Sequence, residues 1–268
     1  MNLSITGPGV YFTIPILGGI PITQTMVSLL LVTIALIVIA LFIRRSLTIR
    51  PGRFQVIVEK LVSMLYGIVE DTMGKHNARF APYIGTLFLS SFFGSVIGMT
   101  YVFRSTTSDL SVTLAWAVVT SGLVWYWNIK NFGFKAWLKG FTEPVVVMTP
   151  MNIVSEIAQP LSMAFRHFGN VAGGSVLTTL IYSALALLSN FVLGWIPKLI
   201  TGWLPELIAS IPILQVGVPA FLSIYFDLFS GFVQAFVFSL LTMVYIAGAC
   251  PPPENEAGED AISTTVEN

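Results

Sequence analysis

Residues 160–188 read PLSMAFRHFGNVAGGSVLTTLIYSALALL, an apolar stretch that contains Arg166. The stretch is longer than the roughly 20 apolar residues that carry a helix across a bilayer. An arginine side chain keeps its proton at any ordinary pH, and placing it at membrane depth costs at least about 2.5–3.5 kcal/mol. The pattern therefore indicates a use for a permanent positive charge inside a membrane.

The composition of the whole chain is typical of a membrane protein. Of the 268 residues, 55% are hydrophobic and 10% are charged, whereas soluble domains carry about 25% charged residues. The formal net charge is zero, which argues against a nucleic-acid partner. One cysteine and two histidines exclude a disulfide framework, a cysteine-based metal site and a histidine cluster. We expect no cofactor and no metal site.

Five apolar segments are long enough to span a bilayer as helices. They lie at about 22–43, 80–103, 110–128, 148–190 and 207–248. The last two would be about 60–65 Å long at 1.5 Å per residue, so each must be either strongly tilted or broken. Pro212, Gly217 and Pro219 favour a kink in the last segment.

The segments between the spans complete the predicted fold. Residues 46–78 have apolar residues at helical spacing mixed with charges, which favours a helix on the membrane surface. Residues 190–206 resemble an interfacial turn. We therefore predict an all-α polytopic membrane protein with a single membrane domain over 1–250. The acidic segment 251–268 is expected to be a disordered cytoplasmic tail.

Lysine and arginine positions predict the orientation, because cytoplasmic loops carry an excess of them. Ten of the 13 fall between the first two spans or after the third. Only Arg104 and Lys198 fall on the opposite side. Five crossings of a bacterial plasma membrane, with the amino terminus outside and the carboxyl terminus in the cytoplasm, fit this distribution.

Polar residues recur along one face of the fourth segment. Asn152, Glu156, Gln159, Arg166 and Asn170 are separated by 4, 3, 7 and 4 residues, intervals that keep them on one side of a helix. The pattern predicts a polar track through an otherwise apolar helix.

A second polar face is predicted on the fifth segment, where Asp227, Ser230 or Gly231, and Gln234 recur every three to four residues. Asp227 and Arg166 are the clearest opposite charges within the spans. We expect an electrostatic link between them, direct or through water.

Three strings carry a resemblance to a known family: SDLSVTLA at 108–115, PLSMAFRHFGN at 160–170 and QAFVFSLLTMVYI at 234–246. Their order and their positions on the spans resemble the signatures of subunit a of the F-type ATP synthase. The resemblance extends over most of residues 20–250, and the combination of all three strings is highly specific.

The resemblance implies that the last two helices form a long, tilted hairpin against a rotating ring of small c subunits, each with a membrane carboxylate. Two offset aqueous half-channels would connect that ring to the two sides of the membrane. The implied partners are the c-ring, the peripheral-stalk subunit b, the rest of the synthase and the lipid bilayer. The family's essential arginine, asparagine and glutamine correspond to Arg166, Asn170 and Gln234.

Three positions depart from the commonest pattern of the family. Ser175 stands where many members have glutamate, and Asp227 stands where many have histidine. Asp227 is therefore expected to take over the work of the missing glutamate. His167 stands where the family usually has an apolar residue.

Other roles remain open for each candidate residue. Arg166 could be satisfied structurally by helix carbonyls or by Glu156, and Asp227 could be solvated at the outer surface. Glu156 could be an interfacial charge or line the cytoplasmic half-channel. Asn170 and Gln234 could be interhelical hydrogen-bond partners. His167 could be a packed residue or a proton relay, and Asp109 is expected to cap the third span.

The first hypothesis for function is a non-catalytic, ion-translocating stator subunit of a rotary synthase. The chain has no phosphate-binding G-x-x-x-x-G-K-[ST] loop, so ATP chemistry would occur in partner subunits. Proton coupling is favoured, with sodium coupling as the alternative. A stand-alone secondary transporter is a further alternative, but no internal repeat is visible. An intramembrane protease lacks its motifs.

Overall fold

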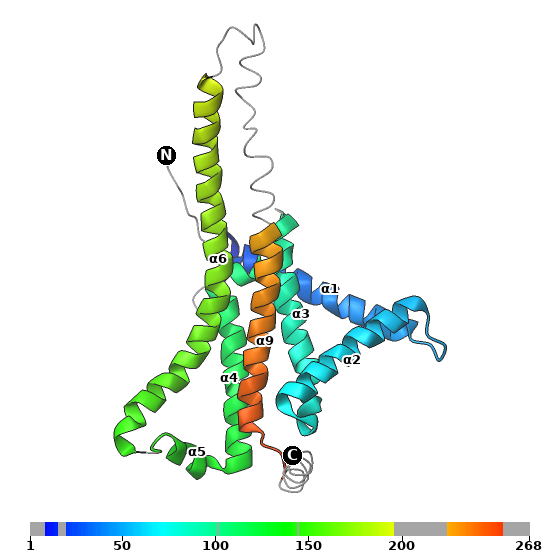
Figure 1. Ribbon diagram of the computed structural model, residues 1–268, viewed down its shortest axis with the longest axis vertical. Helices are drawn as coiled ribbons and strands as arrows, with labels where there is room; N and C mark the ends of the chain where they lie inside the picture. The colour runs from blue at the N-terminus through cyan, green and yellow to red at the C-terminus, as the bar shows by residue number, and fades with distance from the viewer. Residues whose placement is uncertain (1–8, 16–19, 101, 144, 196–223, 254–268) are drawn as a thin grey trace, which may run out of the picture. The chain divides into compact units, whose positions relative to one another are not determined.

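The computed structural model describes residues 9–15, 20–100, 102–143, 145–195 and 224–253, most of which are helical (Figure 1). The main elements are β1 (Val10–Ile14), β2 (Ile20–Thr23), α1 (Gln24–Ser46), α2 (Arg53–Met73), α3 (Ala81–Val96), α4 (Leu110–Phe132), α5 (Phe134–Gly140), α6 (Thr149–Trp195) and α9 (Ser230–Ala249). The short turns are η1 (Lys75–Phe80), η2 (Ile97–Thr100), η3 (Thr106–Ser108), η4 (Val146–Met148) and the π-helical η5 (Ile224–Phe229).

Within the described residues, five helical segments are long and apolar enough to cross a membrane. They are Gln24–Ser46, Lys75–Thr100, Leu110–Phe132, Val146–Leu188 and Ser230–Ala249. This finding confirms the predicted all-α polytopic fold. The fifth predicted span is described only from residue 224 onward. The expected kink at 212–219, most of the expected turn at 190–206 and the tail from residue 254 lie outside the described residues.

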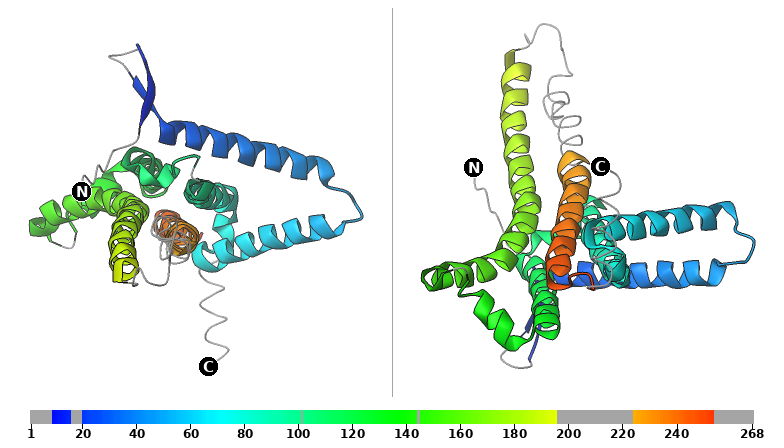
Figure 2. Two further views of the ribbon diagram at one scale, coloured as in Figure 1. Left: turned by 90° about the horizontal axis from the view of Figure 1, so that it is seen from above. Right: turned by 60° about the horizontal axis from the view of Figure 1, so that its bottom comes forward.

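Helix α1 is apolar on nearly all sides. Only 11% of the residues in its most apolar stretch of 18 are buried within the protein, as expected for a helix that faces lipid. Its last turn carries Arg44 and Arg45, whose charges also suit the negative end of the helix dipole. The chain then turns back into α2 through residues 47–52 (Figure 2).

Helix α2 forms within the stretch predicted to lie on the membrane surface. Gly74 ends it at a φ of 82°, a backbone conformation that suits glycine because it has no Cβ. One side of α2 leaves large apolar side chains exposed at helical spacing: Phe54, Ile57, Leu61, Met64 and Ile68. This pattern fits a surface helix, although its depth in a membrane remains a prediction.

Helix α6 is continuous over 47 residues, which corresponds to about 70 Å. That length is more than twice the roughly 30 Å apolar thickness of a bilayer. The sequence left open whether this segment is one strongly tilted helix or a broken one, and the structure shows that α6 is unbroken. Pro160 lies inside it, and a proline removes one backbone hydrogen bond and bends a helix.

Two short elements were not predicted from the sequence. Strands β1 and β2 pair antiparallel, with Val10 opposite Thr23 and Ile14 opposite Ile20. Helix α5 lies between α4 and α6 and begins after Gly133, which has a φ of 86°. Both are too short for the periodicity arguments that identify membrane spans.

The chain divides into two compact units, each of which is described by itself. Unit 1 contains Met1–Val32, Ser91–Val112 and Arg166–Gln234, and unit 2 contains Thr33–Ser90, Thr113–Phe165 and Ala235–Asn268. The packing of unit 2 is mainly apolar. Its hydrophobic cluster consists of Val69, Met73, Phe80, Ala81, Ile84, Val124, Met243, Ile246, Ala249 and Cys250.

Polar side chains fix the end of α9 within unit 2. The carbonyl of Cys250 accepts hydrogen bonds from the side chains of His76 and Asn77, each at 3.0 Å. The carbonyl of Ala249 accepts one from Asn131 at 2.8 Å. The last carbonyls of a helix have no partner within the helix, so these three side chains satisfy groups that would otherwise be left unbonded.

Unit 1 has a different interior. Among its described residues, the buried polar side chains are Thr25, Ser28, Ser91, Ser95, Ser105, Thr106, Thr107 and His167, whereas the buried hydrophobic ones are Val32, Val112 and Val171. Some of the hydroxyls bond to one another: Thr107 Oγ1 lies 3.0 Å from Ser95 Oγ and 2.9 Å from Ser105 Oγ. The described part of unit 1 is therefore held together largely by directional polar contacts.

Candidate ion-translocation site

Helix α6 presents Arg166 on an exposed face within a segment suited to span a membrane. Asn170, one turn later, donates a hydrogen bond to the backbone carbonyl of Arg166 at 3.1 Å. Beside them, a Cβ atom added to Gly169 or Gly173 would meet no other atom within 4 Å. The exposed face therefore combines a permanent cation with small residues that allow another helix to approach closely.

His167, about 100° further round the helix axis, is 1% exposed. Its Nε2 atom lies 2.9 Å from the hydroxyl oxygen of Ser91 on α3. The backbone carbonyl of Gln234 on α9 also interacts with the ring. His167 thus belongs to the polar interior of unit 1 and connects three helices there.

Helix α9 begins after a π-helical turn, η5, that contains Asp227. Such turns are rare and often mark functional sites. The side chain of Asp227 lies outside the described atoms, so its link to Arg166 stays a prediction. Gln234 is half-buried on α9. Gly231 packs so tightly that an added Cβ would lie 2.8 Å from Ser95 Cβ, which brings α9 close to α3.

Glu156, near the start of α6 in unit 2, lines a cavity of about 390 Å³. The indole N–H of Trp125 donates a hydrogen bond to its carboxylate. The other lining residues are Asn128, Trp137, Gly140, Phe141, Glu143, Asn152 and Ser155. Glu156 is therefore placed in a polar recess that could admit water, rather than packed among apolar side chains.

Asn152 has a structural task at this cavity. Its side-chain amide donates to the backbone carbonyls of Phe141 and Glu143 at 2.9 and 3.1 Å. These contacts fix the chain before α6 against its first turns. Although the sequence placed Asn152 on the same polar face as Arg166, its amide is used to hold a loop.

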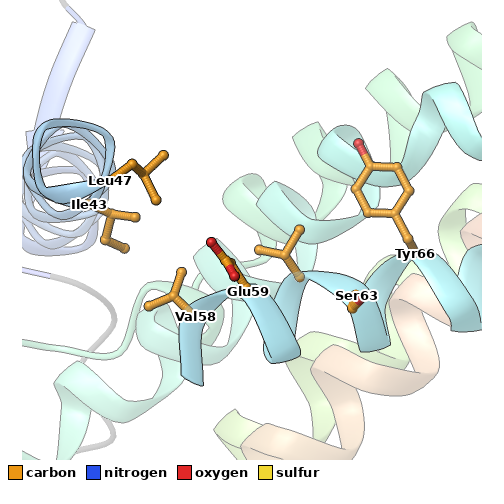
Figure 3. Close-up of a pocket in the computed structure, with 7 residues that line it drawn as sticks. Ile43, Leu47, Val58, Glu59, Ser63 and Tyr66 are labelled. Atoms are coloured by element: carbon orange, nitrogen blue, oxygen red, sulfur yellow. The ribbon is translucent and has the colours of Figure 1, made fainter. Parts of the chain in front are cut away.

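A second cavity, of about 480 Å³, is formed by the end of α1 and by α2. Most of its lining is apolar, with Glu59 as its charged member (Figure 3). Gln55 donates to Glu59 at 2.7 Å and exchanges hydrogen bonds with the backbone of Thr48. None of the residues predicted for ion translocation lines this cavity, so it is not part of the candidate site.

The loop before α4 confirms the predicted cap at Asp109. Its Oδ1 accepts a hydrogen bond from the backbone N–H of Ser111 at 3.0 Å, and its Oδ2 accepts one from Thr25 at 2.6 Å. Burial alone would raise the pKa of this carboxyl, but the hydrogen bonds from Ser111 and Thr25 and the charge of Arg104 hold it below its usual value.

Ser175 is exposed on α6, and its hydroxyl donates to the carbonyl of Ala172 at 2.7 Å. Such a bond to the preceding turn is common for serine in helices. A neutral hydroxyl cannot supply the charge of a glutamate at this position.

Comparison with known proteins identifies the family. A family model described as "ATP synthase A chain" matches residues 25–247. The chain belongs to this family. A sodium-ion-specific ATP synthase subunit a of Propionigenium modestum is 31% identical over 86% of this chain and 75% of its own length. ATP synthase subunit a of Bacillus subtilis is 31% identical over 88% of this chain and 96% of its own length.

Membership in the ATP synthase A chain family makes this chain a multi-pass membrane subunit of a synthase, with the stator role in ion translocation. Six of the predicted residues belong to unit 1, whereas Glu156 belongs to unit 2: Arg166, His167, Asn170, Ser175, Asp227 and Gln234. One relative is specific for sodium and others are named without an ion, so similarity leaves the coupling ion open.

Sequence reasoning missed some of the residues that support the site. Ser91 and Ser95 are spaced by four on α3, and this spacing could have indicated a polar face. Trp125, whose N–H donates a hydrogen bond to Glu156, was not among the predicted site residues. The partner of a tryptophan N–H far along the chain has no local signal in the sequence.

Proposed function

We propose that this chain passes protons between two aqueous half-channels and the carboxylates of a c-ring in an F-type ATP synthase, with Arg166 separating the half-channels. The observation that carries the proposal is the exposed face of α6, on which a guanidinium stands beside Gly169 and Gly173. A ring helix can approach such a face closely enough for its carboxyl group to meet the charge.

The electrostatics of this encounter give the direction of proton transfer. The positive charge of Arg166 lowers the pKa of a carboxylic acid that comes near, because it favours the ionised form. The acid therefore releases its proton as it arrives. The same charge repels a free cation and so blocks a leak between the half-channels. Lysine would be a poorer choice, because burial can neutralise it.

We assign the remaining polar residues to the two aqueous paths. Asp227 would serve the outer half-channel, in place of the glutamate that Ser175 replaces. Glu156 and its recess of about 390 Å³ would form the cytoplasmic entrance. Asn170 and Gln234 would line the path next to Arg166, and His167 would support it from the interior. ATP chemistry would take place in partner subunits.

The excess of lysine and arginine between the first two spans and after the third supports an orientation with the amino terminus outside. The carboxyl terminus would then lie in the cytoplasm of a bacterial cell. In this orientation the partners would be the c-ring, the peripheral-stalk subunit b and the remaining subunits of the complex. Glu156 would then face the cytoplasm, and Asp109 would face the outer side.

Sodium coupling is the second candidate, because a relative of 31% identity is named as specific for sodium ion. The two versions use the same stator and differ in the ion that the ring carboxylate carries. Protons remain the first choice, since the physical account of Arg166 needs only a carboxyl group that gains and loses a proton.

The test is ATP synthesis by the complete synthase in sealed vesicles, energised in sodium-free buffer or by a sodium gradient. Arg166→Ala should abolish coupled synthesis, while the subunits still assemble. Lys135→Ala, which removes an exposed positive charge from α5, should leave synthesis unchanged. Full synthesis in the assembled Arg166→Ala complex would refute the assignment. Synthesis that requires sodium would replace the proton with the sodium version.

A further inference from the structure

We propose that His167 is a positioning residue that fixes the rotation of α6, so that Arg166 faces the ring. The inference rests on the proposed function. It concerns a position at which the family resemblance leads one to expect an apolar side chain, and it gives that departure a purpose.

The geometry of the helix links the two neighbours. Successive residues of an α-helix are about 100° apart around its axis, so a fixed direction for residue 167 also fixes the direction of residue 166. His167 is held inside unit 1 at 1% exposure, and Arg166 is exposed. A rotation of α6 that moved Arg166 off its face would therefore have to break the contacts of His167.

The contacts of His167 are directional and come from two other helices. Ser91 Oγ on α3 lies 2.9 Å from Nε2, and the backbone carbonyl of Gln234 on α9 interacts with the same ring. An aliphatic side chain could fill the space, but it could not select one orientation by hydrogen bonding. In a bilayer such bonds meet no competing water.

The surroundings of His167 are themselves rigid. Gly231 on α9 packs against Ser95 on α3 so closely that a Cβ could not be added without a shift. The rings of Phe92 and Phe232 meet edge to face with centroids 5.8 Å apart. The frame formed by α3 and α9 can therefore resist the sideways force that a moving ring exerts on Arg166.

A proton relay is the competing role for His167, and it makes different demands. A relay needs a ring that gains and loses a proton, whereas a positioning residue needs only the hydrogen bonds. The Ser91 hydroxyl and the backbone of Gln234, which both contact the ring, are neutral. Among the described side chains of unit 1, the charged ones include Arg166 on an exposed face of α6 and, in the loop before α4, Arg104 and Asp109.

Glutamine separates these two roles. Its terminal amide lies about as far from the backbone as Nε2 of histidine and can bond Ser91, but it does not titrate near neutral pH. Three variants in the complete synthase make the test: His167→Gln, His167→Leu and Ser91→Ala. The readouts are ATP synthesis per assembled complex, its pH profile, and the passive proton leak of the vesicles.

The positioning role predicts that His167→Leu and Ser91→Ala each lower coupled synthesis by about tenfold and raise the leak, since a displacement of about 1 Å can cost on the order of 100-fold in a positioned reaction. His167→Gln should stay within about twofold of the original with an unchanged pH profile. The double variant Ser91→Ala/His167→Leu should be no worse than either single change, because both remove the same bond.

Two results would overturn the inference. If His167→Gln is as poor as His167→Leu and shifts the pH profile, the ring is a relay. If Ser91→Ala and His167→Leu assemble and work normally, the contact has no role. If the His167→Leu complex does not assemble, the Ser91→Ala and His167→Gln complexes still distinguish the positioning role from the relay role. Failure of the proposed function would appear separately, as activity in Arg166→Ala.

Discussion

The interiors of the two units differ in the kind of contact that holds them. Unit 2 has a cluster of ten buried hydrophobic residues, whereas the buried side chains in the described part of unit 1 are mostly hydroxyls together with one imidazole. Apolar packing is tolerant of small rotations, because it has no preferred direction. Hydrogen bonds are directional, so unit 1 defines the orientation of its helices more strictly.

The difference follows the distribution of the proposed functional residues. Arg166, Asn170 and Gln234 all belong to unit 1, where polar contacts set the direction of their helices. Between helices in lipid, van der Waals packing and hydrogen bonds provide association, since lipid is as apolar as leucine. A protein that must keep one charge aimed at a moving partner therefore benefits from polar contacts at that place.

The largest expected effect comes from opening the apolar cluster of unit 2. Ile84 is 1% exposed, and Ile84→Ala should lower the free energy of unfolding by about 2–5 kcal/mol, because it leaves a cavity. Thermal unfolding of the purified subunit in detergent measures this change. The complexes that do assemble should retain normal coupling per complex.

Ile37→Ala is the matched control, because Ile37 is 54% exposed on α1 and its removal opens no cavity. Its unfolding midpoint should change little. If Ile84→Ala instead uncoupled the assembled complex while remaining stable, the apolar cluster would also set functional geometry. Polar contacts in unit 1 would then not be what distinguishes functional geometry from stability.

A smaller effect is expected from crowding the polar interior of unit 1. A Cβ at Gly94 would lie 2.1 Å from Thr106 Oγ1, so Gly94→Ala forces the Thr106 side chain or η3 to move. Overpacking of this kind costs about 1–3 kcal/mol. We expect a lower unfolding midpoint and, unlike for Ile84→Ala, a loss of coupled synthesis in the complexes that form.

Gly122→Ala provides the comparison for a helical glycine with free space, because nothing lies within 4 Å of its added Cβ. This change should be neutral or stabilise by about 0.5–1 kcal/mol, since alanine loses less backbone entropy than glycine. Equal midpoints for Gly94→Ala and Gly122→Ala would show that the η3 contact is softer than its geometry indicates.

Much of this fold could be predicted because membrane spans follow from the length of apolar runs. The predicted spans 22–43 and 110–128 differ from Gln24–Ser46 and Leu110–Phe132 by only a few residues. Arg44 and Arg45 marked the end of the first span, since charges are costly inside the bilayer. The β-hairpin was missed because its strands are short and its pairing depends on backbone contacts.

The candidate site was predictable in its residue types and less so in its contacts. Spacing placed Arg166 and Asn170 on one face, and the structure finds both exposed. The same reasoning could not show that His167 bonds Ser91, 76 residues earlier in the chain. Which residues of two helices meet depends on how the helices pack in three dimensions. The hydrophobic periodicity of each helix does not indicate which helix it packs against.

The smallest expected effect concerns Asp109, in the loop of unit 1 that precedes α4. The pKa of this carboxyl is held below its usual value in the folded protein, so ionised Asp109 contributes stability above its unfolded pKa of about 3.9. That contribution is lost as the pH falls through the lower, folded pKa. Asp109→Asn keeps a capping oxygen but cannot ionise, so its unfolding midpoint should depend less on pH below about pH 4.

The matched control is Asp71→Asn, which neutralises an exposed carboxylate on α2. It should leave the acid limb of the unfolding midpoint unchanged. Because Asp109 is only partly buried, screening by solvent keeps its contribution modest, at most about 1 kcal/mol. Thermal unfolding between about pH 3 and pH 7 measures the difference. Identical pH profiles for Asp109→Asn and the original chain would mean that Thr25 and Ser111 bond the neutral acid as well as the anion. The polar contacts around the loop before α4 would then be insensitive to the charge of residue 109.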